Sequence, residues 1–195
     1  MDTYSPQRHS LGYHRPDLDE ETIERDKKRI EANDPIAIHN RGTDYRDGTN
    51  GFPQDLNKAL ELYHRAGELG NPLAYNSIGC TYDQGIIGGA EKQDKKKAKH
   101  YYELAAKGGY ASARYNLGVD EARAGNMGKS LKHFTIAVGS GHDGSLKRIQ
   151  ELYSHGYATK EDYMKALQSY NKYLSEIKSP QRDEAAAYDE DYRYY

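Results

Sequence analysis

The sequence predicts an all-α fold: a right-handed α/α solenoid of about four helical hairpins with an N-terminal capping helix. The first observation is a repeated phrase, because DLNKALELYHRAGELGNPLAYNSIG at residues 55–79 returns in similar form at residues 94–118 as DKKKAKHYYELAAKGGYASARYNLG. The second is a period of roughly 32–39 residues, which is typical of helical repeat arrays. The third is composition: the chain has 19 Tyr, 2 Phe and no Trp, with few large aliphatic residues, and a stack of units that contact only their neighbours tolerates such a thin core.

The capping helix is expected over residues 17–33. Acidic residues stand in its first turn and basic residues in its last, an order that suits the helix dipole. Asp17 is the expected N-cap, and the apolar face is limited to Leu18, Ile23 and Ile30. A frayed linker helix is the alternative interpretation of this segment.

The helical hairpins are predicted over residues 34–70, 71–109, 110–141 and 142–177. The first helix of a unit carries Ala, then Gly five residues later and Tyr after three more. The second helix opens with Asp-x-x-Lys-Ala, and its apolar residues recur at i, i+3, i+4 and i+7, the stripe of an amphipathic helix. Asp55 and Asp94 are expected N-caps, and Pro35 and Pro72 stand in first turns where no hydrogen bond is lost.

Small residues determine the expected packing. Ala and Gly add no bulk, so paired helices can approach closely, and Tyr rings then fill the gaps between layers. A Leu at Gly79 or Ala98 is expected to overpack the array, at a cost of about 1–3 kcal/mol. The units close on glycines that can adopt the left-handed conformation of a helix C-terminus, namely Gly70, Gly109 and Gly141.

The two ends of the chain, residues 1–16 and 178–195, are expected to be disordered. Both contain Ser-Pro-Gln-Arg, at residues 5–8 and 179–182, a pattern that resembles the sites of proline-directed kinases. The C-terminal segment is acidic and rich in Tyr. A solubilising tail is the favoured interpretation, and a helix that binds a partner is the alternative.

This order of residues resembles the Sel-one-like repeat, a family related to the tetratricopeptide repeat. The resemblance covers about residues 34–174 in four units, of which the first two match closely. The departures are Arg41 at the usual Leu position of unit one, Glu121 at the Tyr position of unit three and Gln150 at the Gly position of unit four. The resemblance implies that the first helices line a concave side that binds peptides or partner proteins.

The family's concave positions can be carried over to this chain. Asn76 suits hydrogen bonding to a peptide main chain, and Tyr115 offers a rigid face. A plain solvent-facing surface is the alternative. The candidate partner-binding residues are His39, Thr43, Arg46, Asn76, Cys80, Asp83, Tyr115, Val119, Lys147 and Glu151, with Ala122 and Ser154 at matching positions.

Sequence motifs for chemistry are weak. Cys80 is the single cysteine, and its mid-helix position offers neither a nearby His nor a helix N-terminus to lower the pKa of its thiol. The eight His form no metal-binding pair; three of them, on second helices, are expected mostly on solvent-facing sides: His64, His100 and His133. No metal or cofactor is expected. The glycine-rich stretch at residues 85–92 is interpreted as a turn, because a phosphate-binding loop follows a strand. The basic stretch at residues 94–100 is interpreted as a solvated helix face, with a phosphate or acidic partner as the alternative.

The expected function is a non-catalytic scaffold or adaptor that binds a protein or peptide segment. One alternative is an adaptor subunit of a ubiquitin-ligase assembly, because part of the chain is similar to Sel-one-like repeat proteins of unicellular algae, several of which carry a RING domain. No cysteine precedes Lys27, so ligase activity itself does not carry over. The other alternative is a hydrolase or redox enzyme that uses Cys80.

Composition bounds the setting of the protein. The formal net charge is −2, which gives no indication of nucleic-acid binding. No apolar run has the roughly 18 residues of a membrane span, and the N-terminus lacks the apolar region of a secretory signal. A cytoplasmic or nuclear location, not a secreted one, is expected.

Overall fold

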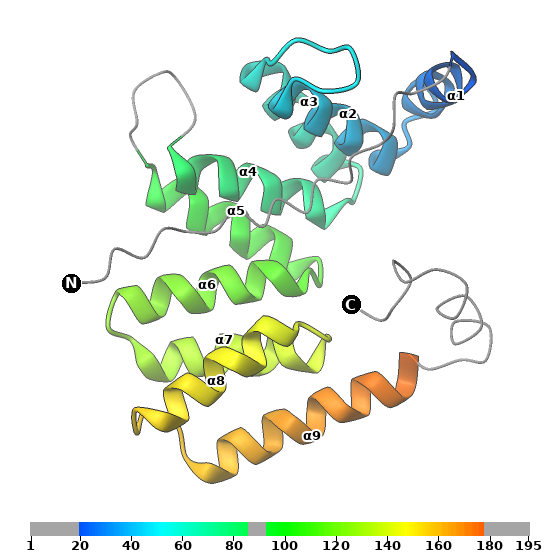
Figure 1. Cartoon of the computed structure of the whole chain (residues 1–195). Helices are drawn as coiled ribbons and strands as arrows, with labels where there is room; N and C mark the ends of the chain where they lie inside the picture. The colour runs from blue at the N-terminus through cyan, green and yellow to red at the C-terminus, as the bar shows by residue number, and fades with distance from the viewer. Residues whose placement is uncertain (1–19, 86–92, 178–195) are drawn as a thin grey trace.

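The computed structural model describes residues 20–85 and 93–177, and all regular structure within them is helical. The predictions for the two ends, the Asp17 cap, Leu18 and most of the glycine-rich turn lie outside these residues. The helices (Figure 1) are α1 (Glu20–Glu31), α2 (Pro35–Asp47), α3 (Leu56–Glu68), α4 (Pro72–Gln84), α5 (Lys95–Lys107), α6 (Ala111–Arg123), α7 (Met127–Gly139), α8 (Asp143–Ser154) and α9 (Lys160–Ile177).

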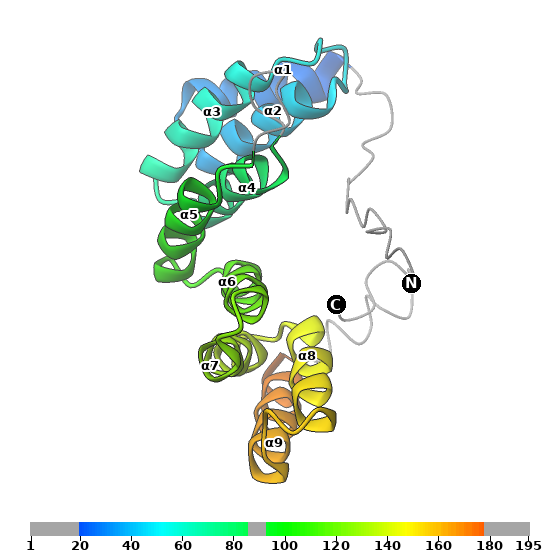
Figure 2. The same ribbon diagram turned by 90° about the vertical axis from the view of Figure 1, so that its left-hand side faces the viewer.

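The helices α2 to α9 form four hairpins that stack in chain order. Figure 2 shows the first helices of the hairpins, α2, α4, α6 and α8, along the inner side of a curved stack, with the second helices outside them. Helix α1 packs on α2 at the start of the stack, and Ile30 contacts the first core cluster. This arrangement confirms the predicted all-α repeat solenoid.

Local signals at the helix ends have the predicted effect. The carboxylates of Asp55 and Asp94 each accept a hydrogen bond of 3.0 Å from a backbone N–H in the first turn. The three closing glycines have positive φ angles, a conformation that costs glycine no Cβ clash. Helices α3 and α5 therefore begin at the predicted N-caps, and the glycines after α3, α5 and α7 have the predicted conformation.

Glycine on the first helix lets an aromatic ring of the second helix rest on its backbone. In unit two, a Cβ atom added to Gly79 would lie 2.6 Å from the ring of Tyr102, closer than real Cβ contacts. The same contact occurs between Gly42 and Tyr63 at 2.8 Å and between Gly118 and Phe134 at 2.6 Å. The predicted close approach of paired helices is thus confirmed in three units.

The two departures from the repeat within units one and three each have an oppositely charged neighbour. The guanidinium of Arg41 lies 4.1 Å from the centre of the Phe52 ring and 3.4 Å from a carboxylate oxygen of Asp44. The side chain of Glu121, 8% exposed, accepts a hydrogen bond of 2.8 Å from Lys99 and one of 2.9 Å from Asn126. These bonds hold the pKa of Glu121 below its usual value, so a charged side chain replaces Tyr without an unpaired charge.

The histidines on the second helices are less uniform than expected. His100 is exposed, as predicted. His64 is half-buried, with its ring edge-on to Tyr101 at 5.4 Å between ring centres. Burial lowers the pKa of the half-buried His133. His64 and His133 are therefore partly covered, whereas His100 has the exposure expected of a solvent-facing side.

Candidate partner-binding surface

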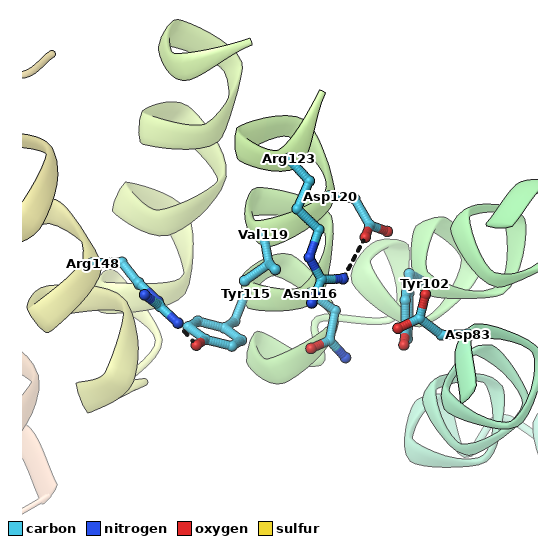
Figure 3. A pocket seen from close by; sticks show the side chains of 8 residues that line it. All are labelled: Asp83, Tyr102, Tyr115, Asn116, Val119, Asp120, Arg123 and Arg148. Carbon is cyan, nitrogen blue, oxygen red and sulfur yellow. Dashed lines mark hydrogen bonds and ion pairs between the residues drawn. The ribbon is translucent and has the colours of Figure 1, made fainter. Parts of the chain in front are cut away.

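An open hollow of about 190 Å³ lies on the concave face, where α4, α6 and α8 meet. Figure 3 shows Asp83 and Tyr102 on one side of it and Arg148 on the other, with α6 between them. The hollow thus spans units two, three and four. Its full lining is Asp83, Tyr102, Tyr115, Asn116, Val119, Asp120, Arg123 and Arg148.

The predicted concave residues fall into three groups. Asp83, Tyr115 and Val119 line the hollow. His39 and Asn76 are only 7% and 8% exposed, so they lie inside the stack and offer little surface to a partner. The remaining candidates lie on the inner helices outside the hollow: Thr43, Arg46, Cys80, Lys147 and Glu151.

The buried candidates join one unit to the next. His39 of unit one shares a hydrogen bond of 3.0 Å with Ser77 of unit two, between Nε2 and Oγ. The Nδ2 group of Asn116 donates to Oδ1 of Asn76 at 3.1 Å, and Nε of Arg148 donates to the hydroxyl of Tyr115 at 3.3 Å. Each unit has a small residue at the same place, namely Ala37, Ala74, Ala113 and Ser145. In every pair, the residue two places after it in one unit contacts the residue three places after it in the next. We call these pairs the inter-unit ladder: His39–Ser77, Asn76–Asn116 and Tyr115–Arg148.

A second repeated contact links the inner helix to the ring behind it. The hydroxyl of Tyr63 lies 3.2 Å from that of Thr43, and the hydroxyl of Tyr102 donates to the sulfur of Cys80 at 3.6 Å. In unit three, Phe134 lacks a hydroxyl and the matching inner residue is Val119. The residue at this inner position is therefore polar where the ring carries a hydroxyl group and apolar where it does not. Thr43 and Cys80 accordingly form hydrogen-bond contacts with the tyrosine of their own unit.

The surroundings of Cys80 favour the protonated thiol over the thiolate. Burial raises the pKa of its sulfhydryl, and the hydrogen bonds from Tyr102 and Asn76 only partly oppose this effect. A nucleophilic cysteine needs the opposite shift. The geometry around Cys80 therefore suits packing and hydrogen bonding inside unit two.

The two ends of the hollow differ in charge: two carboxylates lie at one end and the guanidinium of Arg148 at the other. The carboxylates of Asp83 and Asp120 come from α4 and α6, and burial together with the nearby charge of Asp83 raises the pKa of Asp120. Lys95 pairs with Asp83 at 2.6 Å, and Arg123 lies 3.6 Å from Asp120. At the other end stands Arg148, whose pKa is raised by its bonds to Tyr115 and Glu151.

The three charged candidates outside the hollow already have ionic partners. Arg46 donates two hydrogen bonds to Asp47, at 2.7 and 2.6 Å. Glu151 accepts from Arg148 at 2.8 Å. Lys147, with a side chain 77% exposed, stands 4.0 Å from Asp143. These pairs lie at the rim of the concave face, where each is worth little in water.

Most residues that line the hollow were not predicted from the sequence. The family resemblance indicates a single row of positions along each first helix, which in unit three is Tyr115, Val119 and Ala122. In unit three the hollow is lined by that row and by the row one residue further along the helix, so Asn116, Asp120 and Arg123 join it. Arg148 belongs to the same neighbouring row in unit four. The one available signal was the Asp120-x-x-Arg123 spacing, which places opposite charges on one helix face.

Among the described residues, no group of three or more His, Cys, Asp and Glu side chains could hold a metal ion. Within the same part of the chain, none of the helices has the length and apolar character that crossing a bilayer requires.

Comparison with known proteins gives a consistent result. The Sel1 repeat family matches residues 35–71 and 72–110. The chain is 31% identical over 107 residues to the ERAD-associated E3 ubiquitin-protein ligase component HRD3B of Arabidopsis thaliana, a match that covers 55% of this chain and 16% of that protein.

Two solved structures share the fold. A Sel1 repeat protein from Oxalobacter formigenes has a TM-score of 0.66 and 29% identity, over 80% of this chain and 64% of that one. A protective antigen of uropathogenic Escherichia coli, described as displaying an SLR fold, has a TM-score of 0.62 and 28% identity, over 80% of this chain and 33% of that one. This chain therefore spans less than two thirds of each relative.

Proposed function

The chain is a Sel1-repeat protein, and on that premise we propose that it is a non-catalytic scaffold that holds a segment of a partner protein in the hollow of its concave face. Sel1-repeat proteins are generally protein-interaction scaffolds. The observation that carries the proposal is the hollow itself, which spans three units and combines two tyrosines, an amide and charges of both signs.

The chemistry of the lining suits a protein segment. Tyr115 presents a ring fixed by stacking on His142, with 4.7 Å between ring centres, and its hydroxyl retains a hydrogen to donate after accepting from Arg148. The carbonyl oxygen of Asn116 accepts no hydrogen bond from any described residue, and its orientation is fixed by the bond to Asn76. Rigid aromatic and amide groups bind a partner at low cost in conformational entropy.

The absence of an activated nucleophile in the hollow supports a binding role over a catalytic one. Cys80 lies outside the lining, and burial raises the pKa of its thiol. The carboxylates and guanidinium groups of the hollow are held in ion pairs with their neighbours. Such an arrangement suits recognition of charge on a partner.

A photo-cross-linking experiment tests the proposal. A photoreactive amino acid replaces Arg123 in the hollow, or Lys165 on α9 as a matched control, since these side chains are 63% and 66% exposed. In native extract, the first variant should form a cross-link to a defined protein segment that the second does not form. Equal cross-linking from both positions, or none from the hollow, would contradict the proposal.

The similarity to HRD3B favours one specific kind of scaffold. We infer as a second candidate that the chain serves as an adaptor subunit of a ubiquitin-ligase assembly, with the RING subunit on another chain. Native purification followed by mass spectrometry tests this candidate. A RING protein should co-purify in a fixed ratio, and a stable complex without one would exclude this assignment while leaving the scaffold proposal in place.

A further inference from the structure

We propose that the hollow recognises the order of charges along its partner segment. A basic side chain would bind at the end formed by Asp83 and Asp120, and an acidic side chain at the end formed by Arg148. This inference rests on the proposed function and specifies the chemistry of the partner: an extended peptide that carries one basic and one acidic residue.

The acidic end brings together two carboxylates of low exposure. The side chains of Asp83 and Asp120 are 22% and 20% exposed, and they project from successive inner helices into the same hollow. Two like charges in a partly buried place repel one another; burial first, and then the nearby charge of Asp83, raise the pKa of Asp120. Their present counter-ions are Lys95 and Arg123, whose side chains are 47% and 63% exposed. A Lys or Arg of the partner can therefore take their place while these long side chains turn to solvent.

The basic end is a fixed guanidinium. Nε of Arg148 donates to the hydroxyl of Tyr115, which sets the plane of the group, and Nη1 donates to Glu151 at 2.8 Å. Nη2 donates no hydrogen bond to any described residue. Glu151 is 56% exposed, so it is an easily displaced partner. A carboxylate arriving at this end would gain a charge-assisted hydrogen bond from a donor already oriented.

The middle of the hollow provides contacts that do not depend on charge. The free carbonyl oxygen of Asn116 can accept a hydrogen bond from the main chain of an extended segment, and Val119 supplies an apolar surface beside it. Two Asp and two Arg line the hollow, so their formal charges cancel. A uniformly charged polymer such as a nucleic acid would be repelled at one end, whereas a peptide with opposite charges at its two ends is matched at both.

The probe is a set of synthetic peptides of about a dozen Ser, Gly and Ala residues with one Lys and one Glu. The two charges are placed from adjacent to about six residues apart, in both orders, because an extended chain advances about 3.3 Å per residue. Binding is followed by chemical-shift changes in the backbone NMR spectrum of the full chain. One order at one spacing should bind about threefold to tenfold more tightly than its reverse, the effect of two ion pairs at a partly exposed site.

Single neutral variants then assign each end. Asp83→Asn should make the affinity independent of the Lys, so that a peptide with norleucine in its place binds equally well, while dependence on the Glu remains. Arg148→Gln should do the reverse, and Arg148→Lys should restore part of the dependence on the Glu. Glu161→Gln on α9 is the control, since its carboxylate is 75% exposed and lies outside the hollow. Because each variant is tested against paired peptides, loss of folding would abolish all binding and be recognised from the spectrum.

The outcomes separate this inference from the proposed function. Binding in the hollow that is equal for both charge orders, or variants that change affinity for all peptides alike, would overturn the inference and leave the scaffold proposal standing. Failure of every peptide to bind would also overturn it, because the two charges are the recognition elements it names. Only failure of the cross-linking experiment at residue 123 would overturn the proposed function.

Discussion

Units two and four use the same repeat in different ways. In unit two, Gly79 allows the ring of Tyr102 to lie on the backbone of α4, and the ring is 3% exposed. In unit four, Gln150 stands at the glycine position and is exposed, and Tyr170 at the ring position is half-buried. We infer that the glycine is needed where the ring is buried against the helix backbone, because unit four has neither a glycine at that position nor a fully buried ring.

The largest expected effect is the loss of stability when a side chain is introduced at Gly79 in unit two, compared with the same change at Gln150 in unit four. Gly79→Leu should lower the free energy of unfolding by about 1–3 kcal/mol, because a side chain cannot enter the 2.6 Å space below the Tyr102 ring without displacing it. Gln150→Leu, the matched change in unit four, should alter it by less than about 0.5 kcal/mol. Urea unfolding followed by circular dichroism measures both. Equal losses would mean that the ring contact does not distinguish the units.

The second prediction compares thiols at one position of the repeat. Cys80 in unit two should react with a thiol reagent at neutral pH about tenfold or more slowly than an unstructured cysteine, because burial raises its pKa and limits access. Glu151 occupies the matching position in unit four and is 56% exposed. A Glu151→Cys change in a Cys80→Ser background should therefore label at nearly the free rate. A fast reaction at Cys80 would reopen the possibility of an activated thiol.

The third prediction concerns the junction that holds unit four. The Nδ1 atom of His142 accepts a hydrogen bond of 3.2 Å from the backbone N–H of Ser145 and so caps α8. His142→Ala should lower the free energy of unfolding by about 1 kcal/mol through loss of this cap. His142→Asn should keep most of the stability, because Asn is a good N-cap. Thermal unfolding of the three proteins at neutral pH makes the comparison.

The same residue predicts a dependence on pH. Burial lowers the pKa of His142, and of His39 at the first junction, below the ordinary value of 6.5. The unfolded chain therefore binds protons more readily than the folded one, so the stabilisation is complete above pH 6.5 and is lost as pH falls through the folded-state pKa values. His142→Asn should flatten this dependence in part, leaving the contributions of His39 and His133. An unchanged slope would show that His142 does not titrate at the junction.

The last prediction tests whether the ring of the second helix and the residue it meets on the first helix are energetically coupled. Phe134→Tyr in unit three should cost about 1 kcal/mol, because the new hydroxyl would meet Val119, which offers no hydrogen bond. Adding Val119→Thr should recover part of that loss by recreating the pair that Thr43 and Tyr63 form at 3.2 Å in unit one. A double-mutant cycle gives the coupling. A coupling of zero would mean that the correspondence across units has no energetic basis.

The features that recur from unit to unit could be predicted from the sequence, whereas the features that depend on differences between units could not. The hairpins, their caps and the glycine contacts follow from residues that recur at one spacing, such as Gly42 and Gly79. The hollow depends on how one unit is rotated on the next, and no single unit encodes that rotation. Asn116 and Arg148 therefore went unnoticed, and His39 was expected on the surface although Ser77 of the next unit covers it.

The inter-unit ladder has a consequence for how such a chain can change over time. Each junction is closed by a different chemical pair: an imidazole with a hydroxyl, two amides, and a phenol with a guanidinium. A unit moved to another place would therefore meet a different partner group, with a side chain of another length. The order of the hairpins is thus written into these pairs as well as into the loops that connect them.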